Sequence, residues 1–139
     1  MENRGRMLLL LIPVLLLAGG GAGFLLLRGR HHARPVEKEF PLALNELTVN
    51  LADTGRPHYL SASVTLTIKG ADPEKTVAEY EAQVRDAVLM VMSQRKYQEL
   101  LSPEGKQALK DSLAAEVGKA LAARKLEVTD VLFTTFVMD

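Results

Sequence analysis

The chain has 139 residues, with 17 basic and 17 acidic side chains, and contains neither cysteine nor tryptophan. This length suits one small domain plus a short further segment. Balanced charge gives no general attraction to nucleic acid, and a chain without cysteine has no disulfide framework, no thiol nucleophile and no cysteine metal cluster.

Residues 7–27 form an uninterrupted apolar stretch, MLLLLIPVLLLAGGGAGFLLL, bounded by Arg6 and Arg28. A helix of this length rises about 30 Å, the thickness of the hydrocarbon core of a bilayer. The stretch therefore predicts a single transmembrane helix. A cleaved secretory signal is the alternative, since small residues at 18–23 offer a cleavage site. The apolar stretch is longer than a usual signal core, however, and continues beyond those residues.

Gly19 and Gly23 form a G-x-x-x-G motif within this helix. Small residues at this spacing let two helix backbones approach closely, which predicts self-association or docking with another membrane helix. A glycine-rich apolar segment without such a role is the alternative. Basic residues flank both ends, and the larger number after the helix favours a cytoplasmic C-terminal side by the positive-inside rule.

Residues 28–46 are expected to be a tether, because charges and two prolines interrupt any sustained period. His31 and His32 lie in it, but adjacent histidines on an extended chain point apart and indicate a basic flank rather than a metal site. Two strands follow, at 47–51 and 59–69, and together they predict a hairpin. The second strand alternates cleanly, with one apolar face formed by Leu60, Ala62, Val64, Leu66 and Ile68.

A helix is expected from Pro73 to about Ser93, with Asp72 as its N-cap. Apolar residues recur along it at three- and four-residue steps and form one buried face. Near its end Leu89, Met90 and Met92 widen the apolar surface, which predicts either deep burial or contact with a partner.

A short helical turn at 95–101 leads to a second helix, for which Ser102 is the N-cap and Pro103 the first residue. Gly105 and Lys106 resemble the end of a phosphate-binding loop. A nucleotide site is excluded because the required earlier glycine, the final Ser or Thr and the leading strand are all missing.

The last segment, 126–139, is rich in Val, Leu, Phe and Thr and predicts a strand. By strict alternation, one face carries Val131, Phe133 and Val137, and the other carries Leu132, Phe136 and Met138. Two apolar faces predict a central strand, or a strand whose second face meets another molecule. The order β-β-α-α-β predicts a two-layer α+β domain over residues 47–139.

No catalytic group is evident. Asp53, His58 and Ser61 are close in sequence, but nothing suggests an oriented base or an oxyanion hole. The sequence therefore predicts a protein that is not an enzyme, with no cofactor, no metal, no nucleic-acid partner and no small-molecule substrate.

Three blocks of the chain, in order, resemble the FliL family of flagellar basal body-associated membrane proteins. They are NLADTGRPHYLSASVTL at 50–66, RDAVLMVMSQRKYQELLSPEGKQALKDSL at 85–113, and VTDVLFTTFVMD at 128–139. The resemblance covers nearly all of 45–139, and the apolar stretch precedes it as in the family.

This resemblance implies a bacterial inner-membrane protein. It would have a short cytoplasmic N-terminus (1–6), a transmembrane helix (7–27), a periplasmic tether (28–46) and a periplasmic domain (47–139) with a fold similar to stomatin and prohibitin domains. It implies association with the flagellar stator and basal body, assembly into a ring, and support of torque, swarming or surface sensing. This topology conflicts with the charge bias described above.

The apolar positions without an assigned core role are the candidate surface for a partner or a second copy: Leu89, Met90, Met92, Leu132, Phe136 and Met138. Plain core packing is the alternative for each of them. Two other functions stay open, a membrane-anchored scaffold of another complex and a tethered sensor that binds a small ligand between sheet and helices.

Overall fold

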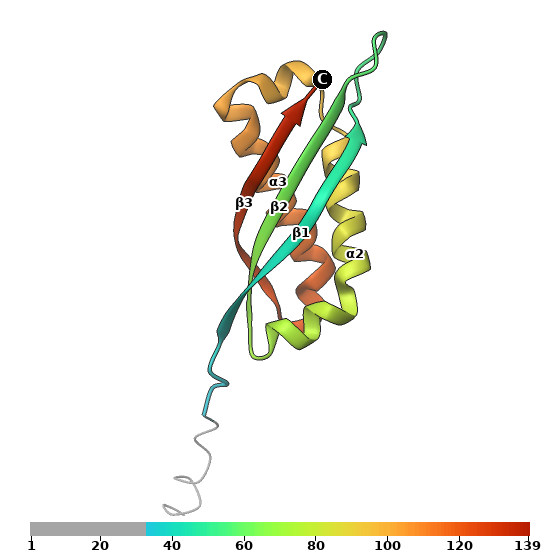
Figure 1. Ribbon diagram of the computed structural model, residues 1–139. Helices are drawn as coiled ribbons and strands as arrows, with labels where there is room; N and C mark the ends of the chain where they lie inside the picture. The colour runs from blue at the N-terminus through green and yellow to red at the C-terminus, as the bar shows by residue number, and fades with distance from the viewer. Residues whose placement is uncertain (1–32) are drawn as a thin grey trace, which may run out of the picture. The chain divides into compact units, whose positions relative to one another are not determined.

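A computed structural model describes residues 33–139, which form a three-stranded antiparallel sheet with two helices on one face (Figure 1). The predicted order of elements and the two-layer α+β class are confirmed. The elements in chain order are β1 (Lys38–Asn50), β2 (Tyr59–Gly70), α2 (Pro73–Ser93), the 3₁₀ turn η1 (Tyr97–Leu101), α3 (Pro103–Leu121), the 3₁₀ turn η2 (Ala122–Arg124) and β3 (Glu127–Met138).

The middle strand is β2, and its clean alternation explains this position. The five apolar residues predicted to share one face are all fully buried, whereas the Ser and Thr residues between them are half-buried. The sheet order is β1-β2-β3, so β3 lies at an edge and the prediction of a central position for it was wrong. After β2 the chain passes through the two helices and re-enters the sheet as β3, along the edge of β2 that does not pair with β1.

The first strand begins at Lys38, not at residue 47, so the second half of the segment expected to be a tether belongs to the sheet. Pro41 is tolerated because β1 is an edge strand, where a residue without an N–H need not break the ladder. A bulge between Leu44 and Leu47 interrupts the period of two, which concealed the strand from sequence analysis. Just before β1 begins, the Glu37 carboxylate accepts a hydrogen bond from the Lys69 ammonium at 2.8 Å. This hydrogen bond raises the pKa of Lys69.

Two bulges also interrupt β3. Ser63 pairs with Thr135 and Val64 pairs with Phe133, which leaves Thr134 as the additional residue between them. An additional residue reverses the facing of everything after it. The helix-facing side of the strand therefore carries Val128, Val131, Phe133, Phe136 and Met138.

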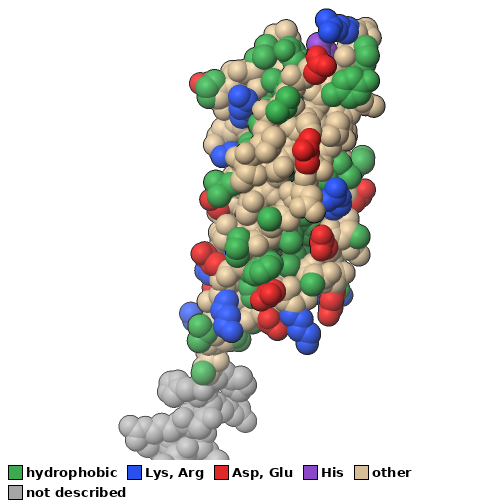
Figure 2. All heavy atoms as spheres, in the orientation of Figure 1, with side chains coloured by type: hydrophobic (Ala, Val, Ile, Leu, Met, Phe, Trp, Pro, Cys, Tyr) green, Lys and Arg blue, Asp and Glu red, His purple; other side chains and the backbone are tan. Residues whose placement is uncertain are grey.

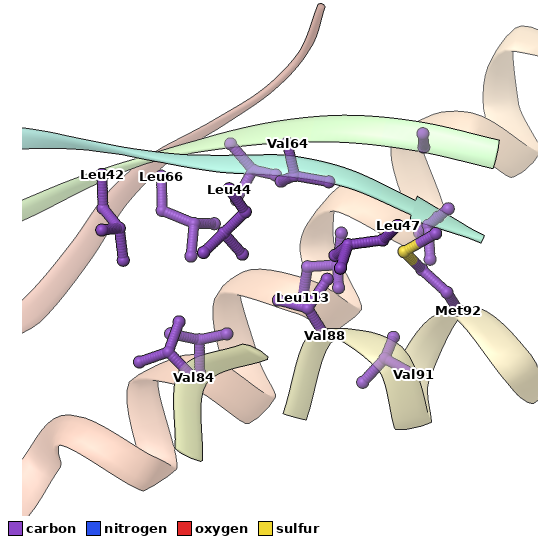
Figure 3. Packing of buried hydrophobic residues seen from close by; sticks show 14 of the residues in the cluster. Leu42, Leu44, Leu47, Val64, Leu66, Val84, Val88, Val91, Met92 and Leu113 are labelled. Atoms are coloured by element: carbon purple, nitrogen blue, oxygen red, sulfur yellow. The ribbon is translucent and has the colours of Figure 1, made fainter. Parts of the chain in front are cut away.

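The core lies between the sheet and the inner faces of α2 and α3, as Figure 3 shows. Leu42, Leu44 and Leu47 of β1 and Val64 and Leu66 of β2 point toward the helices. On the helix side of the core, the side chains that face the sheet are Val84, Val88, Val91 and Met92 of α2 and Leu113 of α3. No polar side chain within residues 33–139 is buried, so this core is held by apolar packing.

The two helices begin differently. The Ser102 hydroxyl accepts a hydrogen bond from the Gly105 amide at 3.0 Å and caps α3 as predicted. Asp72 occupies the N-cap position of α2, but its side chain makes no capping hydrogen bond there. Gly105 lies so close to η1 that a Cβ atom would collide with the Glu99 carbonyl oxygen. The junction from Leu101 to Lys106 thus requires glycine for close backbone approach, not for binding phosphate.

None of the helices described over residues 33–139 is both long and apolar enough to cross a bilayer. The predicted transmembrane segment 7–27, with Gly19 and Gly23, lies outside the described residues.

Candidate interaction surface

Of the three residues near the end of α2 that were predicted to form a partner surface, only one is exposed. Met92 is 0% exposed and belongs to the core, so it is not accessible to a partner. Leu89 is half-buried and packs against the core, and only Met90, at 55% exposure, faces solvent. Met92 follows Val88 by four residues and therefore shares its face of the helix, whereas Met90 lies on the opposite side.

The expected surface on β3 also divides, because the bulge at Thr134 reverses the alternation. Leu132 is 46% exposed on the face of the sheet away from the helices. Phe136 and Met138 lie on the helix-facing side instead, half-buried against the core. The assignment of all three to one face was therefore wrong.

Two further exposed apolar side chains on that outer face were missed. Val137 is 57% exposed, and it pairs with Ser61 next to Tyr59, which is 46% exposed. Strict alternation assigned Val137 to the inner face. A predicted bulge at the Thr134–Thr135 pair would have assigned Val137 to the outer face.

Hydroxyl groups occupy the middle of the outer face, where tan atoms run along the sheet in Figure 2. The Ser61 hydroxyl donates to the Glu46 carboxylate and lies 3.0 Å from the Thr48 hydroxyl. This face is polar at its centre, with apolar side chains at the β3 side.

The helix-facing side of β3 meets α3 through two aromatic rings and two lysines. The rings of Phe133 and Phe136 lie 5.1 Å apart between centroids. The Lys106 ammonium lies 5.2 Å from the Phe136 ring centroid, and the Lys110 ammonium lies 5.7 Å from that of Phe133. Both distances allow cation–π attraction. Two ammonium groups therefore lie beside β3, whose outer edge pairs with no other strand of residues 33–139.

The loop between β1 and β2 is fastened to η1. The His58 and Tyr97 rings stack at 4.3 Å, and the Asp53 carboxylate accepts a hydrogen bond from the Tyr97 amide at 2.8 Å. Asp53 and His58 thus serve structural contacts. Ser61, the third member of the triad considered from sequence, contacts Glu46 instead.

Three depressions of the described surface are open to solvent, and one of them, of about 680 Å³, lies between α2 and α3 beside Gln83, Asp86 and Lys119. One of about 310 Å³ lies between α2 and α3, where the Arg95 guanidinium donates to the Ser112 hydroxyl. Another of about 240 Å³ lies between α3 and the start of β3. No cluster of three or more His, Asp or Glu side chains that could hold a metal ion occurs in residues 33–139.

A three-stranded antiparallel sheet covered on one face by two helices defines the class of small two-layer α+β domains. The chain belongs to the family described as flagellar basal body-associated protein FliL, whose model matches residues 42–138. This match runs through nearly the whole sheet-and-helix domain, from β1 to the last residue of β3.

Flagellar proteins FliL from several bacteria are similar to it. The protein from Escherichia coli strain K12 is 34% identical over 98 residues, which are 69% of this chain and 62% of the relative. The protein from Aquifex aeolicus is 31% identical over 90 residues, 65% of this chain and 55% of the relative. The matched part thus spans less than two thirds of the length of these relatives. The family resemblance seen in the sequence is confirmed.

Proposed function

We propose that the chain is a single-pass inner-membrane protein of the flagellar basal body that assembles into a ring and supports the motor stator without catalysing a reaction. The observation that carries this proposal is the family match over residues 42–138, which covers the folded domain. The apolar stretch 7–27 would be the anchor, with residues 1–6 in the cytoplasm and the domain in the periplasm.

The described surface supports a binding role. Its exposed apolar side chains are spread over several elements, among them Met90, Leu101, Leu132 and Val137. Such a distribution suits a protein with more than one neighbour in an assembly, as each member of a ring has. Gly19 and Gly23 would add contacts between membrane helices.

The two alternatives differ in support. A scaffold of another membrane complex would use the same architecture, and only its partners distinguish it. A ligand sensor would need a pocket with converging polar groups. The three depressions described between residues 33 and 139 are open to solvent, and no fully buried polar side chain lines them, so they give the sensor no specific support.

Topology provides the first test. The natural chain has no cysteine, so Thr54→Cys introduces a single thiol in an exposed loop. We expect a membrane-impermeant maleimide to label this thiol in intact cells whose outer membrane has been made permeable. A thiol that reacts only after the inner membrane is dissolved would place the domain in the cytoplasm and overturn the proposal.

Motility provides the second test. Deletion of the gene is expected to lower swimming or swarming speed, and the full-length chain is expected to restore it. The chain without residues 1–32 should fail to restore speed because it lacks the anchor. Restoration by that shortened chain would contradict the role assigned to residues 7–27.

A further inference from the structure

The two edges of the sheet are built differently. At its start, β1 carries the charged residues Lys38 and Glu39 and the imino acid Pro41, followed by a bulge. Charges, proline and bulges are the means by which proteins protect an edge strand from further pairing. β3 also has two bulges and the acidic residues Glu127 and Asp130, but it contains no proline, and its last stretch, 135–138, is regular and uncharged. In the described part of the chain no strand pairs with its outer side.

The end of β3 turns its backbone toward the open edge. Tyr59 and Asp139 exchange both of their backbone hydrogen bonds, at 2.9 and 3.1 Å. Hydrogen-bonded and non-hydrogen-bonded pairs alternate in an antiparallel ladder. The next alternate residues, Met138 and Phe136, therefore direct their N–H and C=O groups away from β2. These N–H and C=O groups form a short row to which a further strand can hydrogen-bond.

Positive charge lies directly beside this row. Lys106 and Lys110 are one turn apart on α3 and reach over the rings of Phe136 and Phe133. The ion pairs of residues 33–139 are Lys69–Glu37 and Lys119–Glu116, so neither of these two ammonium groups is paired with a carboxylate there.

Asp111 and Asp130 line a shallow depression together with Lys110, and each accepts a hydrogen bond from a neutral group. Asp111 accepts a hydrogen bond from the Gln107 amide at 2.9 Å, and Asp130 accepts one from the Val131 backbone amide at 2.8 Å. The shallow depression between α3 and β3 lies beside these groups and extends the site along the strand. An incoming carboxylate can therefore pair with Lys106 and Lys110, neither of which forms an ion pair within residues 33–139.

We infer that the open edge of β3 binds an extended, acidic segment of a partner protein, which adds to the sheet as a fourth strand with its carboxylates at Lys106 and Lys110. Strand addition supplies affinity through main-chain hydrogen bonds, and side chains at alternate positions supply specificity. Apolar residues at the alternate positions of the segment would point to the outer face of the sheet, beside the exposed Leu132 and Val137. This inference deepens the proposed function by giving the chemistry of one partner contact.

Binding of labelled decapeptides to the full-length chain in mild detergent tests the inference. The probes are an alternating aspartate–valine peptide, a lysine–valine peptide of equal length, and an aspartate–valine peptide in which one neighbouring aspartate–valine pair at its centre is replaced by two prolines, so that an N–H group facing β3 is lost in either register. We expect the first peptide to bind at least tenfold tighter than either of the others, by fluorescence anisotropy. Proline should abolish binding because it removes an N–H group that pairs with β3.

The matched variants are Lys106→Gln/Lys110→Gln and the control Lys75→Gln/Lys96→Gln, which removes the same charge elsewhere. We expect the first to weaken binding of the acidic peptide about fivefold or more, the scale of two exposed ion pairs, and the control to change it little. Amide hydrogen exchange over residues 133–139 should slow when the peptide is bound.

Equal binding of the acidic and basic peptides, unchanged binding to Lys106→Gln/Lys110→Gln, or retained binding of the proline peptide would each overturn the inference. Because the assay contains no motor, its failure leaves the proposed flagellar function standing. Absence of stator contacts in cells would remove that function without affecting the peptide result.

Discussion

At the scale of single residues, Gly105 shows how a short motif can imitate a functional one. Its hydrogen position faces the Glu99 carbonyl oxygen, so a methyl group would force the backbone apart. We expect Gly105→Ala to lower the free energy of unfolding by about 1–3 kcal/mol, the usual cost of overpacking. Urea unfolding of the soluble domain measures this change.

Gly118 provides the control in the same helix, because a Cβ atom there would meet nothing within 4 Å. Gly118→Ala should therefore stabilise the domain by about 0.5–1 kcal/mol through reduced chain entropy and better helix propensity. If both substitutions change stability equally, the close approach of α3 to η1 is not as described.

Met92 and Met90 are two residues apart and have opposite environments. Met92→Ala should cost about 2–5 kcal/mol, since it removes a fully buried side chain from the core. Met90→Ala should leave the thermal melt nearly unchanged because its side chain is largely exposed. A large loss of stability in Met90→Ala would contradict its place on the surface.

At the scale of elements, the two helix starts have different dependence on their caps. Ser102→Ala should cost about 0.5–2 kcal/mol because it removes the bond from the Gly105 amide. Asp72→Ala should cost clearly less, since the Asp72 side chain makes no capping bond. Denaturant midpoints of the two variants, compared with the wild type, give the difference directly, and equal losses would contradict the observed caps.

Regular periods predicted the elements that are regular. The alternation of β2 and the three- and four-residue steps of α2 predicted the strand at 59–69 and the helix bounds correctly, because each has one buried face along its whole length. The position of Met92 on the face of Val88 was also accessible from the helical period. Its exclusion from the partner surface needed only that geometry.

The start of β1 and the faces of β3 were predicted wrongly because both strands contain bulges. The three-residue step from Leu44 to Leu47 and the additional Thr134 each reverse the facing of a strand, and nothing local in these sequences fixes where the additional residue falls. The position of each additional residue is decided by the register of the strand with β2, which depends on tertiary contacts. The faces of Phe136, Met138 and Val137 were therefore assigned wrongly, and the contact of Lys106 with the Phe136 ring could not be predicted.

At the scale of the whole molecule, one face of the sheet is used for the core and the other stays open. The helices cover the apolar side, and the outer side keeps its row of hydroxyl groups with Leu132 and Val137 beside it. This arrangement leaves an outer face, an open strand edge and the exposed side of α2 for neighbours. A member of an assembly around a motor component needs several such surfaces at once.

The central claim is that these surfaces meet the flagellar stator and further copies of this chain. In-cell crosslinking of the tagged full-length protein, followed by mass spectrometry of the captured proteins, tests it most directly. The account predicts that stator subunits and copies of the chain dominate, with crosslinks on the exposed faces of the domain. Dominance of other membrane proteins, with stator subunits expressed but absent from the captured set, would contradict it.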